Sequence, residues 1–303
     1  MQQSLFKKLF NQVAQKLSLI LRGNSSMQVI DSAEPSHQIS AGAPDANDLS
    51  VSLAKQKQHM EFLADLDFYL EYQPQVTPHN NQFIGSEALL RARDAHGEVV
   101  MPYVFLPWLE NAGMMRSIDL WVANEAVKQS AIWHEMGLNA PIKINVTSDT
   151  LMDEATTDAL IAKIAEAHGR ISIEIVEQDF SAGLDKAVNA IARVQALGGK
   201  VYIDDFGTGY SSLSYLNSLK ADCLKIDRSF VLGLDSPEGE KVMAGIFNFA
   251  QTLGYGLVVE GVETQEQLAK IPNNIPFSVQ GWLYSKAIPA DQIPAFAQQY
   301  SGN

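Results

Sequence analysis

The 303-residue chain has a single cysteine, Cys223, and no apolar run long enough to cross a bilayer. One cysteine excludes both an internal disulfide framework and a cysteine-based zinc site. The six histidines are scattered without metal-ligand spacing, so we expect surface or structural roles for them. Because Lys16 interrupts the N-terminal apolar stretch and no small-residue cleavage site follows, we expect a cytoplasmic protein, either free or peripheral at the inner membrane surface.

Basic residues are also scarce. The chain has 22 Lys and Arg and 35 Asp and Glu, which gives a net charge of −13. Non-specific binding to duplex nucleic acid depends on basic contacts, so this balance argues against such a partner. It does not exclude a small anionic substrate, because bound metal ions can invert the local field.

The few positive charges are concentrated at the N-terminus. Residues 1–22 carry Lys7, Lys8, Lys16 and Arg22 and no acid, with apolar residues at helical spacing. This pattern predicts a basic amphipathic helix, which contacts either a membrane surface or a protein surface. Residues 23–50 are rich in Gly, Ser, Pro, Ala and Asp and predict a flexible linker. A lead-in helix is expected over 51–67, before the main domain at 68–303.

The main domain alternates short apolar runs with helical patterns. The runs are 68–74, 83–91, 142–147, 171–177, 200–206, 223–228, 257–261 and 278–282. Helical stretches lie between most of them, for example 184–197 and 238–253. This order predicts an α/β fold, a (β/α)8 TIM-like barrel. The connection between the first two runs is too short for a parallel crossover, so we expect a hairpin and one antiparallel strand in the barrel.

Polar residues mark the ends of seven of these runs, where a barrel of this type carries its chemistry. They are Glu87, Asn145, Glu174 with Glu177, Asp204 and Asp205, Lys225, Glu260 and Gln280. The adjacent acids Asp204 and Asp205 need a counter-charge, and Gly207 and Gly209 allow a sharp turn after them. Oxygen donors without His or Cys favour Mg²⁺ or Mn²⁺, and this many acids can hold two ions. Two such ions suit in-line displacement at phosphorus.

Lys225 places a positive charge within the acidic ring. It can orient an attacking water or neutralise phosphoryl oxygens. The alternative is Schiff-base chemistry, which needs a lysine of lowered pKa; neighbouring carboxylates raise it instead. Borohydride trapping distinguishes the two.

Over about 68–300 the chain resembles the EAL-domain family of cyclic-di-GMP phosphodiesterases. The signature tripeptide is Glu87-Ala88-Leu89. The other segments that carry the resemblance, in order, are YQP at 72–74, INVT at 144–147, EIVE at 174–177, DDFGTGYSSLSYL at 204–216, LKIDRSF at 224–230, VVEGVET at 258–264 and QGW at 280–282. The resemblance implies a barrel with one antiparallel strand and hydrolysis of cyclic-di-GMP to linear 5′-pGpG with Mg²⁺ or Mn²⁺.

The resemblance also implies roles for single residues. Glu87, Asn145, Glu174 and Asp204 would hold one metal ion, and Asp204 and Asp205 would share the second. Lys225 would contact the catalytic water, and Glu260 would be either a metal ligand or the general base. Arg91 would contact a substrate phosphate. The side chains of Gln73, Leu89 and Gln280 would line the substrate pocket. Supporting roles would belong to Glu177, Glu263 and Asp227, and Asp227 would also lie beside the substrate.

The chain departs from the family pattern at Val176, Val146-Thr147 and Val259, and none of these changes removes a ligand. It also departs at Trp108, in the segment FLPWLENAGMM near the expected pocket rim. Some EAL domains have lost catalysis and act as cyclic-di-GMP receptors or scaffolds, which is the alternative function here. Family members often pair near the DFGTG loop, so the resemblance also implies a homodimer.

Overall fold

The computed structural model describes residues 46–176, 183–208 and 218–302. The predicted helix over 1–22, the linker up to residue 45 and Glu177 therefore lie outside the described residues. The chain divides into two compact units: a smaller one of Met1–Tyr69 with Arg91–Ala112, and a larger one of Leu70–Leu90 with Gly113–Asn303. Of the helices described, none combines the length and apolar character needed to cross a membrane.

The larger unit contains the barrel. Its strands are β1 (Asp67–Thr77), β2 (Gln82–Arg93), β4 (Ile142–Asn145), β5 (Ile171–Val176), β6 (Val201–Phe206), β7 (Cys223–Ile226), β8 (Gly256–Glu260) and β9 (Ser278–Gln280), with the outer ends of β1 and β2 in the smaller unit. The order β1-β9-β8-β7-β6-β5-β4-β2 closes on itself because β1 also pairs with β2. The predicted eight-stranded barrel is confirmed.

The direction of β1 also agrees with the prediction. β1 pairs with β9 in antiparallel register, Val76 opposite Val279, whereas β2 pairs in parallel with β4 and each later strand pairs in parallel with the next. The short turn between β1 and β2 permits only a hairpin. One antiparallel strand therefore completes an otherwise parallel barrel.

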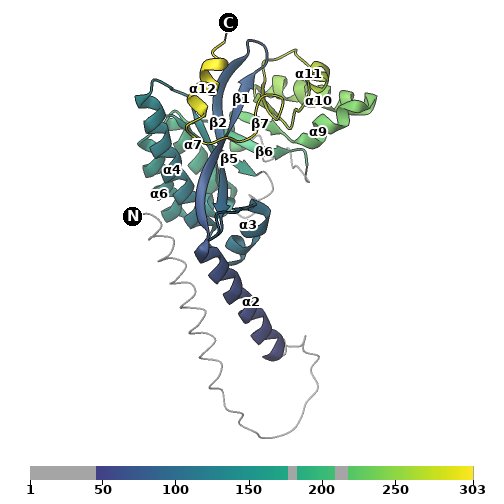
Figure 1. Cartoon of the computed structure of the whole chain (residues 1–303). Helices are drawn as coiled ribbons and strands as arrows, with labels where there is room; N and C mark the ends of the chain where they lie inside the picture. The colour runs from purple at the N-terminus through teal and green to yellow at the C-terminus, as the bar shows by residue number, and fades with distance from the viewer. Residues whose placement is uncertain (1–45, 177–182, 209–217, 303) are drawn as a thin grey trace, which may run out of the picture. The chain divides into compact units, whose positions relative to one another are not determined.

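Helices surround these strands. They are α4 (Met115–Glu135), α5 (Ser148–Met152), α6 (Glu154–Ala165), α7 (Leu184–Ala196), α9 (Arg228–Leu232), α10 (Pro237–Leu253), α11 (Gln265–Lys270) and α12 (Ile293–Gln299). Figure 1 shows α4, α6 and α7 along one side of the barrel strands and α9, α10 and α11 along another. α7 buries Ala187, Ala190, Ile191 and Val194, one face of a helix. α10 starts at the Ser236 cap and stops at Gly254, which adopts a left-handed φ of 79°.

The smaller unit holds α2 (Ala46–Asp65), β3 (Val99–Val100) and α3 (Pro102–Asn111). α2 begins at Ala46 rather than at 51, so the last residues of the expected linker are helical. Composition suggested a linker there, but Ala46 and Asp48 are well tolerated in the first turn of a helix. Trp108 of α3 stacks on His59 of α2 at 4.1 Å between ring centroids and meets Phe62 edge-on. The unusual tryptophan thus serves packing within the smaller unit.

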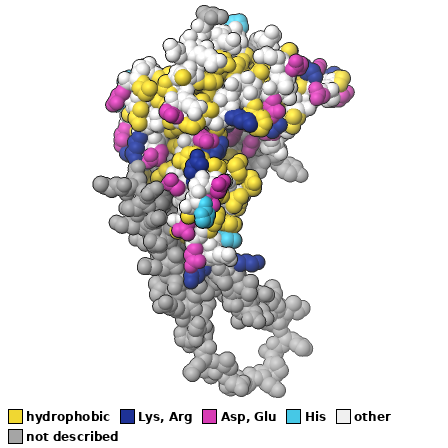
Figure 2. Space-filling view, viewed as in Figure 1, with side chains coloured by type: hydrophobic (Ala, Val, Ile, Leu, Met, Phe, Trp, Pro, Cys, Tyr) yellow, Lys and Arg dark blue, Asp and Glu magenta, His cyan; other side chains and the backbone are white. Residues whose placement is uncertain are grey.

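Alternation along the strands separates the helix-facing core from the barrel interior. On β4, Ile142 and Ile144 are fully buried, and Lys143 and Asn145 alternate with them. The interior is therefore polar at this level, and it contains the charged residues described below. Outside, acidic and basic side chains are interspersed with apolar ones over the visible face of the larger unit (Figure 2). That face carries no continuous basic patch among the described residues.

A buried carboxylate on α4 fixes the segment that follows β4. Asp119 is 4% exposed, and one of its oxygens, Oδ2, accepts hydrogen bonds from Thr147 N (2.9 Å), Thr147 Oγ1 (2.7 Å) and Thr150 Oγ1 (2.7 Å). Burial raises the pKa of Asp119, and these hydrogen bonds oppose that rise. Asp119 therefore anchors the backbone two residues beyond Asn145.

We expect Asp119→Ala to lower the free energy of unfolding by about 2–4 kcal/mol, because it leaves a backbone N–H and two hydroxyls without their acceptor. Urea denaturation measures this loss. The matched control is Asp158→Ala, which removes an exposed pair with Arg193 (2.7 Å) and should change little. Equal losses in the two variants would contradict the anchoring role.

Candidate active site and metal centre

Lys225 on β7 is the centre of a buried cluster of acids. Its Nζ lies 2.5 Å from Glu174 Oε2, 2.8 Å from Glu260 Oε1, 2.9 Å from Asp204 Oδ1 and 3.4 Å from Glu87 Oε2. The lysine side chain is 1% exposed. The four carboxylates come from β5, β8, β6 and β2, so one ammonium contacts strands far apart in the sequence. Glu87 lies in the middle of β2 rather than at its end, because β2 continues to Arg93.

Glu87 is held by neutral donors as well. Asn145 Nδ2 donates to Glu87 Oε1 at 2.7 Å, and Gln280 Nε2 donates to Glu87 Oε2 at 2.5 Å. Gln280 Oε1 in turn accepts from Gln75 Nε2 at 2.6 Å, and Gln280 Nε2 approaches Gln73 Oε1 at 3.5 Å. This amide network orients Glu87. Because Asn145 donates through Nδ2, its Oδ1 is the atom of the Asn145 side chain that can act as an acceptor.

Asp204 and Asp205 are brought to the same side by an irregularity in β6. Adjacent residues of a regular strand point to opposite faces, but the β6–β7 register shifts between Ile203 and Phe206. Asp205 has a φ of 53°, a left-handed conformation that is costly for a side-chain residue. As a result, oxygens of Asp204, Asp205 and Glu260 lie within 4.8 Å of one another.

The carboxylates in the cluster outnumber its one ammonium group. Burial raises the pKa of Glu260 to about 7, and burial together with the charge of Glu87 raises that of Glu174 well above its usual value. Burial acts upward on Glu87 too, but Lys225 and the hydrogen bonds from Gln280 and Asn145 outweigh it, so its pKa is lowered. Burial would lower the pKa of Lys225, but the surrounding carboxylates raise it well above normal. One lysine does not neutralise these acids.

The donor set fits divalent metal ions that prefer oxygen ligands. Glu174 Oε1 and Asp204 Oδ1 are buried and accept no hydrogen bond from any described residue, although Asp204 Oδ1 lies within ion-pair distance of Lys225. Buried carboxylate oxygens without donors are costly unless a cation binds them. Carboxylates and one amide, without His or Cys, match Mg²⁺ or Mn²⁺.

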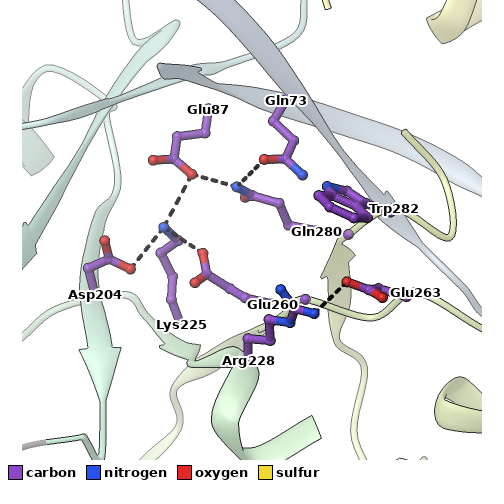
Figure 3. A pocket seen from close by; sticks show the side chains of 11 residues that line it. Gln73, Glu87, Asp204, Lys225, Arg228, Glu260, Glu263, Gln280 and Trp282 are labelled. Carbon is purple, nitrogen blue, oxygen red and sulfur yellow. Dashed lines mark hydrogen bonds and ion pairs between the residues drawn. The ribbon is translucent and has the colours of Figure 1, made fainter. Parts of the chain in front are cut away.

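A cavity of about 270 Å³ opens over this cluster. Figure 3 shows Glu87, Asp204, Lys225 and Glu260 at one side of it and Arg228, Glu263 and Trp282 at the other. Arg228 Nη2 pairs with Glu263 Oε1 at 2.8 Å. Trp282 is 56% exposed, with Lys286 Nζ 4.4 Å and Arg228 Cζ 6.0 Å from its ring centroid. A deep acidic end and a mouth formed by an Arg228–Glu263 ion pair and the Trp282 ring thus share one cavity.

The residues of this site lie within the segment that matches a known protein family. The EAL domain family profile matches residues 56–287, well over half of the chain. The chain belongs to the EAL-domain family.

Two curated relatives illustrate the similarity. The EAL domain described here is 34% identical over 239 residues to the probable cyclic di-GMP phosphodiesterase PdeB of Escherichia coli K12, which covers 77% of this chain and 45% of PdeB. It is also 34% identical over 260 residues to the bifunctional diguanylate cyclase/cyclic di-GMP phosphodiesterase MucR of Pseudomonas aeruginosa, covering 80% of this chain and 37% of MucR. The chain thus spans less than half the length of these relatives.

Solved structures share the fold. The EAL enzyme Bd1971 in its cAMP-bound form superposes with a TM-score of 0.74 at 27% identity, covering 84% of this chain and 76% of that one. The MucR phosphodiesterase in complex with c-di-GMP gives a TM-score of 0.69 at 31% identity, covering 82% and 98%. These neighbours agree with the closed barrel of the EAL domain described above.

Most residues singled out from the sequence meet in this site. Those that the structure brings together are Gln73, Glu87, Asn145, Glu174, Asp204, Asp205, Lys225, Glu260, Glu263 and Gln280. Leu89 lies on β2 two residues after Glu87 and outside the cavity lining, and Arg91 belongs to the smaller unit. Asp227 caps α9, accepting from Ser229 N at 2.9 Å. Its substrate role stays a prediction.

Sequence reasoning missed four residues of the site. Arg228 and Trp282 line the cavity, and Gln75 donates a hydrogen bond to Gln280. Gly261 also lines the cavity and packs closely against Arg228, because a Cβ at Gly261 would lie 2.5 Å from Arg228 Cβ. Arg228 and Trp282 stand inside the quoted segments LKIDRSF and QGW, so the signal was present. Gln75 lies one residue beyond the run at 68–74, outside the segments singled out from the sequence.

We expect Lys225→Met to destabilise the metal-free EAL domain by about 3–5 kcal/mol, because the buried carboxylates lose their counter-charge. Thermal unfolding in EDTA measures the loss, and added Mn²⁺ should recover more stability in the variant than in the wild type. Lys270→Met, which removes an exposed pair with Asp235, is the control and should unfold almost as the wild type does. A variant as stable as this control would refute the assignment of Lys225 as the charge centre.

Proposed function

We propose that this EAL domain hydrolyses cyclic-di-GMP to linear 5′-pGpG. The observation that carries the proposal is the cluster of oxygen donors from β2, β4, β5, β6 and β8 around Lys225, all but the β2 donor near the carboxyl ends of their strands. The names of PdeB and MucR as cyclic di-GMP phosphodiesterases support the substrate.

Two Mg²⁺ or Mn²⁺ ions fit this donor set. The proposed ligands are Glu87, Asn145, Glu174, Asp204 and Asp205, with Glu260 as a further ligand unless it acts as the general base. When bound, such ions supply a water of lowered pKa and stabilise the charge that develops on the phosphoryl oxygens. The raised pKa values of Glu174 and Glu260 describe the protein without metal, in which these carboxylates lack sufficient counter-charge.

The chain's own groups then have distinct tasks. Lys225 Nζ, fixed by several carboxylates, directs a donor toward the attacking water and the phosphoryl oxygens. Glu260 is either a metal ligand or the general base, since its carboxylate lies beside both Asp204 and Lys225. Gln73, Leu89, Arg91, Asp227 and Gln280 are proposed to contact substrate, and Glu177 and Glu263 to support the site.

The cavity mouth suits a nucleobase. About 270 Å³ is less than the roughly 300–1,000 Å³ of pockets that enclose drug-sized ligands. The cavity therefore takes the reacting phosphodiester, and the bases of the dinucleotide lie toward its rim. Trp282 presents an exposed aromatic face there, beside the cations Arg228 and Lys286. Such a surface stacks guanine and attracts phosphate.

We expect Glu87→Gln to lower turnover of cyclic-di-GMP at least about 100-fold, because metal-derived charge stabilisation contributes several kcal/mol to such reactions. Chromatography of the products with Mn²⁺ present measures linear pGpG. Glu240→Gln, an exposed position on α10, is the control and should match the wild type.

The same assay tests the alternative function. Wild-type protein that binds cyclic-di-GMP and forms no linear product with Mn²⁺ or Mg²⁺ would refute the enzyme and support a receptor or scaffold. Formation of a different product would refute the stated cleavage.

We expect Trp282→Ala to raise KM about 5- to 100-fold with a smaller change in kcat, because stacking on one base contributes about 1–3 kcal/mol. Steady-state kinetics measures both constants. Trp282→Phe keeps an aromatic face and should retain most of the affinity. Equal impairment in the two variants would rule out stacking as the role of Trp282.

The proposed homodimer and the contact of residues 1–22 with a membrane surface or a partner protein stay predictions, as does a location in the cytoplasm or at the inner membrane surface. Residues 1–22 and most of the segment after Gly207 lie outside the part of the chain that the structure describes.

A further inference from the structure

A second lysine lies inside the barrel and is not explained by the proposed site. Lys143 on β4 is fully buried, at 0% exposure. Its Nζ donates no hydrogen bond to any described residue and forms no ion pair with one. A buried ammonium without an acceptor is unfavourable, and buried lysines are normally paired.

Lys143 is adjacent to the candidate metal ligands on the barrel strands. It precedes Asn145 by two residues on β4 and so shares that residue's face of the strand. In the parallel ladders it stands opposite Glu87 on β2 and Ser172 on β5. Lys143 therefore lies beside Glu87 in the β2–β4 ladder and one interior-facing position before the Asn145–Glu174 pair of the β4–β5 ladder.

The surroundings of the Lys143 amine are arranged to accommodate it. Its Nζ lies 5.3 Å from the ring centroid of Tyr202 on β6, a cation–π contact. Gly85 on β2 leaves room, because a Cβ there would come within 3.1 Å of Nζ. Burial lowers the pKa of Lys143 to about 8, and the charge of Glu174 opposes that fall.

The two buried lysines differ in how they act. Lys225 contacts the carboxylates and holds them in place. Lys143 contacts none of them, yet its charge interacts with Glu174 and Glu87 through a medium of low dielectric. A positive charge behind the ligands offsets part of the negative potential that attracts a divalent cation.

We propose that Lys143 weakens the affinity of the acidic centre for divalent metal ions and so sets the metal concentration at which the site fills. Lys143 acts through the ligands rather than on substrate, which makes it a positioning and tuning residue. The proposal rests on the metal centre of the proposed function.

The test is direct metal binding by two neutral variants, Lys143→Met and Lys143→Gln. Binding of Mn²⁺ to the full chain is measured by the loss of the free-ion electron paramagnetic resonance signal. Because removal of a buried positive charge near the ligands strengthens the attraction for a divalent cation, Kd for Mn²⁺ should fall about 10-fold or more. A merely structural lysine would leave Kd unchanged or raise it, so the sign of the change decides.

Tyr202→Phe is the matched control, because it removes a polar atom from the surroundings of Lys143 without changing charge; its Kd for Mn²⁺ should equal that of the wild type. If both Lys143 variants bind Mn²⁺ as the wild type does, or more weakly, the proposal is overturned. If neither variant folds, the proposal is also overturned, because Lys143 would then have a structural role. Wild-type protein that binds no Mn²⁺ overturns the metal centre itself, whereas turnover without tighter binding in the variants overturns only the tuning role.

Discussion

The buried contact between one ammonium and several carboxylates is the interaction on which the site depends. Lys225 Nζ lies within ion-pair distance of Glu87, Glu174, Asp204 and Glu260. Each of these acids would be unfavourable alone in a barrel interior. Together they exceed the charge of the lysine, and Glu174 Oε1 is buried without a hydrogen-bond donor among the described residues. The site is therefore built to be completed by further positive charge.

The fold supplies the geometry that this interaction needs. Closure of the barrel through β1 brings β9 beside β1, so that Gln280 reaches both Gln75 and Glu87. The bulge in β6, with Asp205 in a left-handed conformation, turns two consecutive acids toward Glu260. Asp119, buried on α4, anchors the chain just after Asn145. Local irregularities thus occur where ligands must converge.

The sequence predicted the barrel well because its strands are short apolar runs separated by helical patterns, and the hairpin followed from one short connection. The strand-end acids could be assigned from the same pattern, since carboxyl ends of barrel strands share one rim. Other features depend on three-dimensional neighbours. Nothing local distinguishes Lys143 in IKINVT from a solvent-facing lysine, and the alternation that buries it becomes evident only when β4 lies between β2 and β5. The sequence did not indicate that Asp227 also caps α9, because that role depends on where the helix begins. The start of α2 at Ala46 was obscured by a composition typical of linkers.

The most direct test of the central claim is anomalous diffraction at the manganese edge from crystals grown with Mn²⁺ and cyclic-di-GMP. The account predicts two manganese peaks about 4 Å apart, bound by Glu87, Asn145, Glu174, Asp204 and Asp205, with a phosphodiester of the ligand beside them. Absence of manganese from this cluster, or manganese bound elsewhere while the dinucleotide occupies the cavity, would contradict it.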